Sequence, residues 1–481
     1  MGPVKRRTKI VATIGPASDA PAVLERVILA GADVARIGLA HGSLDEALAR
    51  YRAVRAVSER LRRPVGTMVD LPGPKVRLAS FGSAPTLLAT DSTVELVPGL
   101  GSSDAATIGV DYEGLLTDVH PGDLLAVGDG SVSLQVESVE GDRVRARVAY
   151  GGMTQGRPGL HVPSERLGIT SPTDQDLRYL DAFVEAGVDI VAVSFVRSAH
   201  DIRRIGTEPH PRGPLVVAKI ETRAAVENLD GIIAEAGAIM IARGDLGTEL
   251  GIEELPLLQK RITRDCISGG KPVITATQMF ESMITSPAPT RAEVSDVANA
   301  IFDGTSAVML SAETAVGHDP VAAVDAMSRV AARADQEFDF DAWARRIRLL
   351  RRSAVGESAG ARITDAMTAA AWRAATEMDV AAIICISDTG FTVRSMARFR
   401  PSMPILAFSP DERTVRQLTL SWGTVPLRAE SRVDTSDRMD ELIVAARDAG
   451  MVRTGQLVAV LAGAGDRTIR ATDVLRLSRV P

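Results

Sequence analysis

The segment LVVAKIETRAAVENLDGIIAEAGAIMIARGD, from Leu215 to Asp245, joins two short apolar runs through an amphipathic stretch. We predict strands over residues 215–221 and 238–242, with a helix over 224–236 between them. Strands that alternate with helices in this way indicate a parallel sheet. Their nearly continuous apolar character is typical of a sheet that is covered on both faces.

The same unit recurs through the first two-thirds of the chain. Further strands are predicted at residues 9–15, 33–39, 65–71, 189–196, 272–277 and 307–312. Eight strand–helix units favour a closed (β/α)8 TIM barrel over an open doubly wound sheet. No Gly-x-Gly-x-x-Gly motif follows the first strand, which argues against a dinucleotide-binding fold.

The alternation is interrupted twice, which predicts three domains in an α/β fold. Short strands separated by turns, at 93–97, 124–127, 132–136 and 143–148, indicate an all-β lid domain over residues 72–157, inserted after the third strand. The barrel then comprises residues 1–71 and 158–340, and a C-terminal α/β domain follows over 345–481. An insertion at the C-terminal end of a barrel strand lies over the catalytic face.

Composition excludes several classes of protein. The 481 residues include 45% apolar and 24% charged residues, as in globular proteins, and the net charge of −6 argues against a nucleic-acid binder. No apolar run reaches the ~18 residues of a membrane span. The only cysteines, Cys266 and Cys385, suggest no disulfide framework. We expect a soluble cytoplasmic protein without nucleic-acid or membrane partners.

Polar residues gather at the C-terminal ends of the predicted strands, which is the catalytic end of such a barrel. They are Arg36, His41, Asp70, Ser194, Arg197, Lys219, Glu221, Arg243, Asp245, Thr277, Ser311 and Glu313. Strand alternation points Lys219 and Glu221 to the same side, with Asp245 one strand later beside Gly244. Two carboxylates without a histidine or cysteine cluster suit Mg²⁺ or Mn²⁺.

Cations near these carboxylates point to phosphoryl transfer. Lys219, Arg36 and Arg77 would neutralise a transferring phosphoryl group. Neither a P-loop nor a glycine-rich kinase loop is present. The alternative for Lys219 and Glu221 is a buried structural ion pair. Only six of the 55 basic residues are lysines, so Lys75 and Lys219 are candidates for roles that arginine does not fill.

Several motifs together closely resemble pyruvate kinases, from about Thr8 to Val480. They are TKIVATIGPAS (8–18), VAR (34–36), HGS (41–43), DLPGPK (70–75), KIE (219–221), ARGDLG (242–247), ATQM (276–279), TRAEVSDVANA (290–300) and DGTSAVMLSAET (303–314). The resemblance implies a barrel, a β-rich lid, a C-terminal α/β domain and a homotetramer. It implies that phosphoenolpyruvate and ADP give pyruvate and ATP.

The resemblance also implies roles for individual residues. Glu221 and Asp245 would bind the divalent metal, Lys219 would lie against the transferring phosphoryl group, and Arg36 would bind the phosphate. The backbone of Arg243, Gly244 and Asp245 and the side chain of Thr277 would hold the substrate carboxylate. Thr277, Ser311 and Glu313 would belong to the region that protonates the enolate, and Arg77 and His41 would lie near the nucleotide.

The chain departs from the family around the monovalent-cation site. The family's Asn-Phe-Ser-His-Gly is here Gly38-Leu39-Ala40-His41-Gly42, the threonine after Asp70 is Leu71, and the glutamate of potassium-requiring members is Lys75. The ammonium of Lys75, together with Asp70, is predicted to take the place of potassium, so we expect no potassium requirement.

The loop Ser387-Asp388-Thr389-Gly390-Phe391-Thr392 resembles the family's effector-phosphate loop. Hydroxyl and backbone N–H groups of Ser387, Thr389, Gly390 and Thr392 could bind a sugar phosphate or a nucleoside monophosphate. Plain helix capping is the alternative. Two alternatives remain for the whole protein: a degenerate paralogue with a regulatory role, and another barrel enzyme that uses a metal-stabilised enolate.

Overall fold

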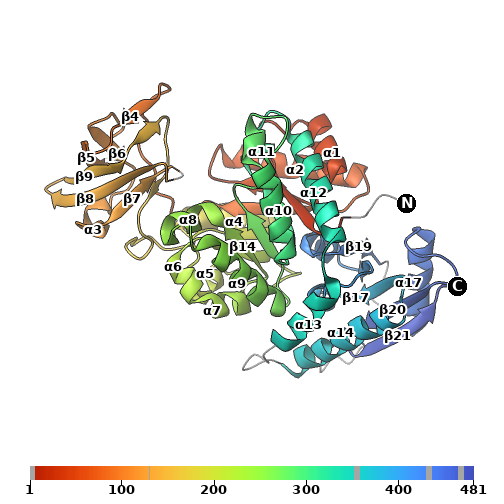
Figure 1. Cartoon of the computed structure of the whole chain (residues 1–481). Helices are drawn as coiled ribbons and strands as arrows, with labels where there is room; N and C mark the ends of the chain where they lie inside the picture. Colours follow the sequence, from red (N-terminus) through yellow and green to blue (C-terminus); the bar gives the residue numbers. More distant parts are fainter. Residues whose placement is uncertain (1–5, 129, 351–357, 430–435, 464–470) are drawn as a thin grey trace.

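The computed structural model describes residues 6–128, 130–350, 358–429, 436–463 and 471–481. Eight parallel strands close a barrel in the order β1-β16-β15-β14-β13-β12-β3-β2 (Figure 1). They are β1 (Lys9–Thr13), β2 (Val34–Gly38), β3 (Gly66–Leu71), β12 (Ile190–Val193), β13 (Leu215–Ile220), β14 (Ala238–Ala242), β15 (Val273–Ala276) and β16 (Ala307–Leu310). The predicted barrel is confirmed, and each of its strands lies within a predicted run.

Helices surround the barrel. They are α1 (Pro21–Ala30), α2 (Leu44–Arg60), α4 (Asp174–Glu185), α5 (Ala199–Arg203), α6 (Arg223–Glu227), α7 (Leu229–Glu235), α8 (Arg243–Leu250), α9 (Leu255–Ser268), η1 (Glu281–Ile284), α10 (Arg291–Phe302), α11 (Ala312–Ala315) and α12 (Pro320–Gln336). Ser43, Thr173 and Thr290 begin α2, α4 and α10 with capping boxes. The single helix predicted over 224–236 is wrong, because Asn228 ends α6 before α7 begins.

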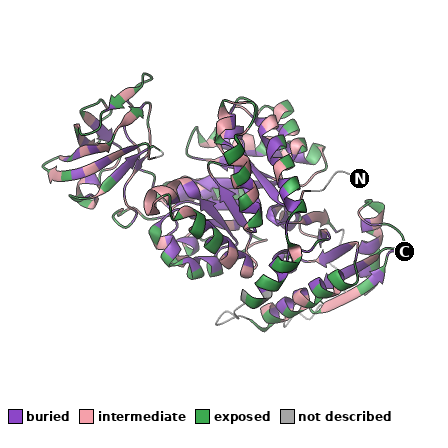
Figure 2. Cartoon of the chain, viewed as in Figure 1, coloured by how far each residue is buried: buried purple, intermediate pink, exposed green. Residues whose placement is uncertain are grey.

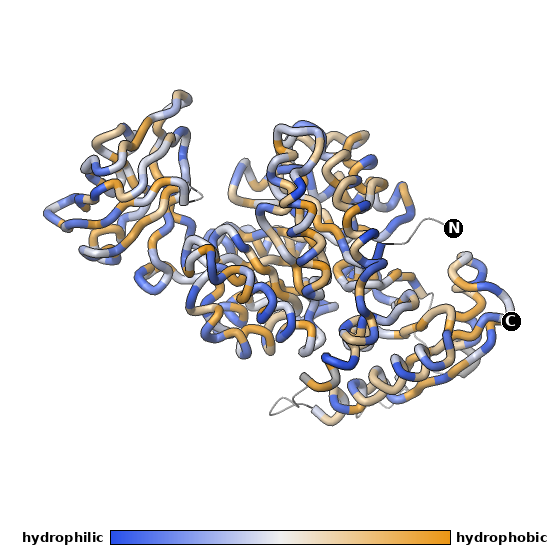
Figure 3. The backbone as a smooth tube through the Cα atoms, viewed as in Figure 1, coloured by the Kyte–Doolittle hydropathy of each residue, from blue (hydrophilic) through white to orange (hydrophobic). Residues whose placement is uncertain are grey.

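The barrel strands are buried except at the partly exposed Arg36, Gly38, Val216 and Lys219, as the mostly purple strands of Figure 2 and the orange segments of Figure 3 show. Apolar side chains such as Val11, Met68, Met240 and Ile274 fill the interior. The interior is therefore a packed core rather than a pore, and it leaves the strand ends as the place for polar chemistry.

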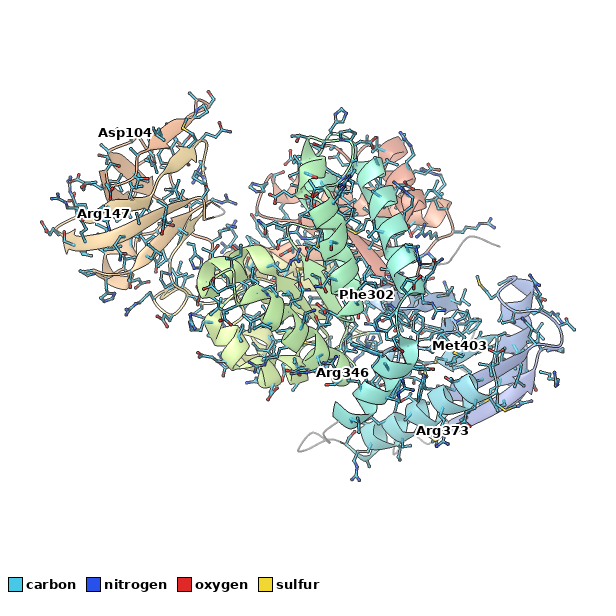
Figure 4. The ribbon with its side chains drawn as sticks, viewed as in Figure 1. Asp104, Arg147, Phe302, Arg346, Arg373 and Met403 are labelled. Atoms are coloured by element: carbon cyan, nitrogen blue, oxygen red, sulfur yellow. The ribbon has the colours of Figure 1, made fainter. Side chains whose placement is uncertain are left out.

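An all-β domain, here called the inserted β domain, lies between β3 and α4, apart from the barrel at the left of Figure 1. Its strands are β4 (Thr86–Leu88), β5 (Thr93–Pro98), β6 (Thr107–Val110), β7 (Leu124–Val127), β8 (Val132–Glu140), β9 (Arg143–Tyr150), β10 (Gly152–Thr154) and β11 (Leu160–His161), with the short helix α3 (Leu115–Asp118). The larger sheet has the order β11-β7-β8-β9-β5-β6. Asp104 and Arg147, labelled in Figure 4, belong to this domain.

The C-terminal domain is built on a five-stranded sheet of order β19-β18-β17-β20-β21. Its strands are β17 (Ala382–Ile386), β18 (Ile405–Ser409), β19 (Thr424–Arg428), β20 (Leu457–Ala462) and β21 (Val474–Arg479). Its helices are α13 (Phe340–Leu350), α14 (Ala359–Glu377), α15 (Phe391–Ala397), α16 (Glu412–Gln417), η2 (Leu418–Leu420) and α17 (Ser436–Asp448). In the part of the chain that is described, no helix has the length and apolar character of a membrane span.

Candidate active site

Arg36, Asp70 and Lys219 form a buried charge network at the C-terminal ends of β2, β3 and β13. Asp70 Oδ2 lies 2.6 Å from Arg36 Nε, and Asp70 Oδ1 lies 3.3 Å from Lys219 Nζ. Burial alone would raise the pKa of Asp70, but Lys219 and Arg36 hold it below its ordinary value. Asp70 therefore stays ionised and orients both cations.

Three oxygen atoms surround the ammonium group of Lys219. Besides Asp70, its Nζ lies 2.9 Å from Glu221 Oε1 and donates a 2.6 Å hydrogen bond to Ser194 Oγ. Burial would lower the pKa of Lys219, but Asp70 and Glu221 raise it above the ordinary value. Lys219 is thus a fixed positive charge rather than a proton donor near neutral pH.

Glu221 and Asp245 offer two carboxylates of different exposure. Glu221 is buried, and its Oε2 accepts a 2.7 Å hydrogen bond from the backbone N–H of Phe195. Its Oε1 lies beside Lys219 but accepts no hydrogen bond of good geometry. Burial and the nearby Asp245 raise the pKa of Glu221, against the opposing effect of Lys219. The Asp245 side chain is 35% exposed at the start of α8.

Thr277 lies next to the start of α8, where its Oγ1 accepts a 2.9 Å hydrogen bond from Gly244 N. Its φ of 65° is unusual for a β-branched residue. The buried Arg243 side chain stabilises this backbone by donating 2.6 Å and 3.2 Å hydrogen bonds to the carbonyls of Thr277 and Ala276. The Arg243 guanidinium also pairs with Asp296 at 2.7 Å, so only its backbone is left for a ligand.

The Glu313 side chain bridges the loops that follow β15 and β16 by hydrogen bonds. Its Oε1 accepts from Phe280 N at 3.1 Å, and its Oε2 accepts from Ser311 N at 2.6 Å. Both carboxylate oxygens of this buried side chain are therefore engaged with backbone. The geometry makes Glu313 a positioning residue for Ser311.

His41, Lys75 and Arg77 form a basic rim beside the inserted β domain. Burial lowers the pKa of His41, and the positive charges of Arg77 and Lys75 lower it further. Lys75 Nζ lies 4.0 Å from Asp245 Oδ1, whereas Asp70 is engaged by Arg36 and Lys219. The structure thus pairs Lys75 with Asp245 rather than with Asp70. A side chain at Gly38 would meet open space.

The residues of the predicted effector loop have local partners. Thr389 Oγ1 accepts from Phe391 N at 3.4 Å, and Thr392 Oγ1 lies 2.6 Å from Thr472 Oγ1. Ser387 is buried, and Gly390 has a φ of 76° directly before α15. The helix begins at Phe391. The structure brings the four predicted residues together, with Thr392 turned to Thr472.

One group of residues that joins the inserted β domain to the barrel was not predicted from the sequence. His161 Nε2 lies 2.9 Å from Glu249 Oε2, and Arg223 N donates to Glu249 Oε1 at 3.3 Å. Ser164 Oγ also donates to Glu249 Oε1. Glu249 is far in sequence from His161, Ser164 and Arg223, so no motif spacing indicates this group. Thr13 was also missed: its Oγ1 accepts a 3.0 Å hydrogen bond from Arg36, and its place at the end of the first strand could have revealed it.

The fold and the site together define a class of protein. A closed parallel barrel that joins buried carboxylates, a fixed lysine and an arginine on its catalytic face is a barrel enzyme suited to anionic, phosphorylated substrates.

Comparison with known proteins identifies the family. The family described as pyruvate kinase, barrel domain, matches residues 5–324, and pyruvate kinase, alpha/beta domain, matches residues 365–478. The pyruvate kinase of Clostridium acetobutylicum is 35% identical over 479 residues, covering 99% of this chain and 100% of its own. That of Methylorubrum extorquens is 38% identical, with 99% and 98% covered. A solved pyruvate kinase from Cryptosporidium parvum matches with a TM-score of 0.88 at 30% identity, covering 99% of this chain and 96% of that chain. The chain belongs to the pyruvate kinase family and is a phosphotransferase.

Proposed function

We propose that this enzyme transfers the phosphoryl group of phosphoenolpyruvate to ADP, giving pyruvate and ATP in glycolysis. The observation that carries the proposal is the Arg36–Asp70–Lys219 network, which fixes two cations side by side at the strand ends. Phosphoryl transfer depends more on positioning and charge neutralisation than on covalent catalysis.

In the proposed reaction, a β-phosphate oxygen of ADP forms a bond to the phosphorus atom of phosphoenolpyruvate. The bond between that phosphorus and the enol oxygen breaks at the same time. Lys219 and Arg36 bind the phosphoryl oxygens, and Lys219 remains protonated because Asp70 and Glu221 raise its pKa. The backbone N–H groups at the start of α8 and the hydroxyl of Thr277 orient the substrate carboxylate. The enolate left behind takes up a proton from the region of Thr277 and Ser311, which Glu313 holds in place.

Glu221 and Asp245 fit a divalent cation, Mg²⁺ or Mn²⁺. Glu221 Oε1 is a buried oxygen that lies 2.9 Å from Lys219 Nζ without a hydrogen bond of good geometry, and oxygen ligands suit hard cations. The described residues contain no cluster of three or more His, Cys, Asp or Glu side chains arranged for a metal, but a two-carboxylate site draws its other ligands from water and substrate. The cation would supply charge neutralisation at the substrate oxygens.

We also propose that potassium is not required. The open space at Gly38 and the lack of a polar side chain at Ala40 support the loss of a potassium site, and Lys75 supplies a tethered monovalent charge at the same face. Its contact with Asp245 puts this charge nearer the metal carboxylates than the sequence suggested.

A coupled assay for pyruvate tests these proposals. ADP-dependent formation of pyruvate supports kinase activity, ADP-independent formation would indicate another enolate-forming barrel enzyme, and no turnover would indicate a degenerate paralogue. The assay is run in tetramethylammonium buffer free of sodium and potassium, and potassium is then added. A tenfold rise in rate, about 1.4 kcal/mol of transition-state stabilisation, would overturn potassium independence.

We further propose that residues 72–157 act as a lid, that the enzyme is a cytoplasmic homotetramer, and that a sugar phosphate or a nucleoside monophosphate binds near Ser387, Thr389, Gly390 and Thr392. Sedimentation measures the oligomeric state. Phosphoenolpyruvate saturation curves with a panel of these phosphates test the effector, and identical curves would remove it from the proposal.

A further inference from the structure

A small cavity lies between the barrel and the C-terminal domain, on the side away from the active site. The junction runs between the labelled Phe302 and Met403 in Figure 4. Lys271 and Ser306 line the cavity from the barrel, and Arg394, Arg400 and Ser421 line it from the C-terminal domain. The cavity has room for little more than one water-sized group.

Three of the lining residues, Arg394, Arg400 and Ser421, carry four buried donor atoms that have no hydrogen-bond partner. They are one terminal nitrogen of Arg394 (Nη1), two nitrogens of Arg400 (Nε and Nη1) and Oγ of Ser421. Arg394 is only 6% exposed and Arg400 only 1% exposed. A buried donor that lacks an acceptor is costly, and a charged donor more so. Such a concentration of unpaired donors around one cavity indicates a missing acceptor.

The other groups near these guanidiniums do not supply a negative charge. Arg394 Nη2 donates to Thr389 O at 2.9 Å and lies 2.9 Å from His210 Nε2. Burial and the charge of Arg394 lower the pKa of His210 to about 3, so this ring is neutral. Arg400 donates to the carbonyls of Gly304 and Thr305, which are also neutral.

The carboxylates of the neighbourhood are engaged elsewhere. Asp335 accepts hydrogen bonds from Arg7 N and Thr8 N at 2.7 and 2.9 Å, and Asp365 pairs with Arg398 at 2.5 Å. Among the described residues, no carboxylate lines the cavity. Burial lowers the pKa of Lys271 to about 8, and the charge of Arg394 adds to this effect. The described lining of the cavity therefore carries positive charges and no negative one, although Asp335 acts on Arg400 from outside the cavity.

We propose that a single small inorganic anion binds in this cavity between Arg394 and Arg400 and fastens the C-terminal domain to the barrel. The anion would accept hydrogen bonds from the guanidinium nitrogens without partners and from Ser421, and it would offset the positive charge of the cavity lining. The size of the cavity favours a halide over a tetrahedral oxyanion. This site is separate from the predicted effector loop, whose residues 387–392 do not line it.

Thermal unfolding in chloride-free gluconate buffer tests the proposal, with chloride or inorganic phosphate added at constant ionic strength. We expect chloride to raise the unfolding midpoint saturably by about 2–4 °C, since ligands of the native state stabilise it by mass action. Arg394→Met should abolish this rise. Arg413→Met is the matched control, because Arg413 also crosses the junction, to the carbonyls of Pro211 and Arg212, but does not line the cavity.

A crystal of the wild-type enzyme grown in bromide provides a test that no variant can confound. An anomalous peak between Arg394 and Arg400 is the expected result. A cavity without such a peak would overturn the proposal, as would a chloride response that Arg394→Met retains. A response to phosphate but not to chloride would overturn the assignment to a halide-sized anion.

Discussion

The replacement Glu221→Gln tests the central assignment of the active site. It preserves the size of a side chain that is 1% exposed, and the amide oxygen can still accept the hydrogen bond from Phe195 N. What it removes is the negative charge beside Lys219 and the anionic oxygen that Mg²⁺ would require. The change is therefore chemical rather than steric.

The expected losses in activity and in stability differ in size. Without an anionic metal ligand, kcat should fall by about 10³-fold or more, which corresponds to about 4 kcal/mol. Breaking a buried ion pair costs about 3–5 kcal/mol of folding free energy. Lys219 keeps Asp70 at 3.3 Å and Ser194 at 2.6 Å, so we expect the free energy of unfolding to fall by only about 1–3 kcal/mol.

Initial rates of pyruvate formation across a Mg²⁺ titration measure the first loss, and urea unfolding measures the second. Asp303→Asn is the control, since Asp303 is a largely buried carboxylate paired with Lys260 outside the site, and its loss should reduce stability but not kcat. If Glu221→Gln kept more than a tenth of wild-type kcat at saturating Mg²⁺, the metal assignment would be refuted.

Three other changes test neighbouring parts of the molecule. The pKa of Asp70 lies below its ordinary 3.8, so its carboxylate stabilises the fold above about pH 4 and loses this effect as the pH falls through the lower folded value. Asp70→Asn should thus reduce the free energy of unfolding by about 3–5 kcal/mol at pH 7, and urea unfolding should show the difference narrowing below pH 4. The pKa of Glu249 is likewise below its ordinary 4.5, against burial, because His161 and Ser164 contact it. Glu249→Gln should therefore speed limited proteolysis near residues 161–164 at pH 7, and unchanged cleavage would contradict a joint between the two domains. Thr277→Val removes the hydroxyl that is proposed to orient the substrate carboxylate and that accepts from Gly244 N. It should lower kcat/KM for phosphoenolpyruvate at least tenfold, about 1.4 kcal/mol, whereas Thr277→Ser should retain most of the activity.

The sequence alone predicted the barrel because its signal is local. Each barrel strand is a short apolar run that is buried on both faces, and such runs stand out between amphipathic helices. In the inserted β domain the longer strands β5, β7, β8 and β9 were predicted in the same way. Four strands were not predicted: β4, β10 and β11, whose two or three residues carry no readable periodicity, and the four-residue β6 (Thr107–Val110).

The C-terminal domain shows the same limit. Strand β21 pairs antiparallel with β20 along its full length, but it was not predicted. Its alternating apolar and polar residues do not match its burial, since Leu477 is exposed at the sheet edge whereas Ser478 is buried. Strand β19 was not predicted either. Edge strands take their structure from pairing with a neighbour, which a local pattern does not contain.

At the active site, strand alternation correctly predicted that Lys219 and Glu221 point to the same side. The polar residues at the strand ends predicted which face of the barrel carries the candidate active site. Which of these charged side chains form ion pairs with one another is decided by the tertiary structure. Lys75 lies against Asp245 rather than Asp70, because Arg36 and Lys219 already engage both oxygens of Asp70. The anion cavity likewise arises where Arg394 and Arg400 meet Lys271, more than a hundred residues away in sequence. Whether a charged side chain is buried is decided only when distant segments pack together. A buried charge without a partner is costly, so the packing also decides which charges require one.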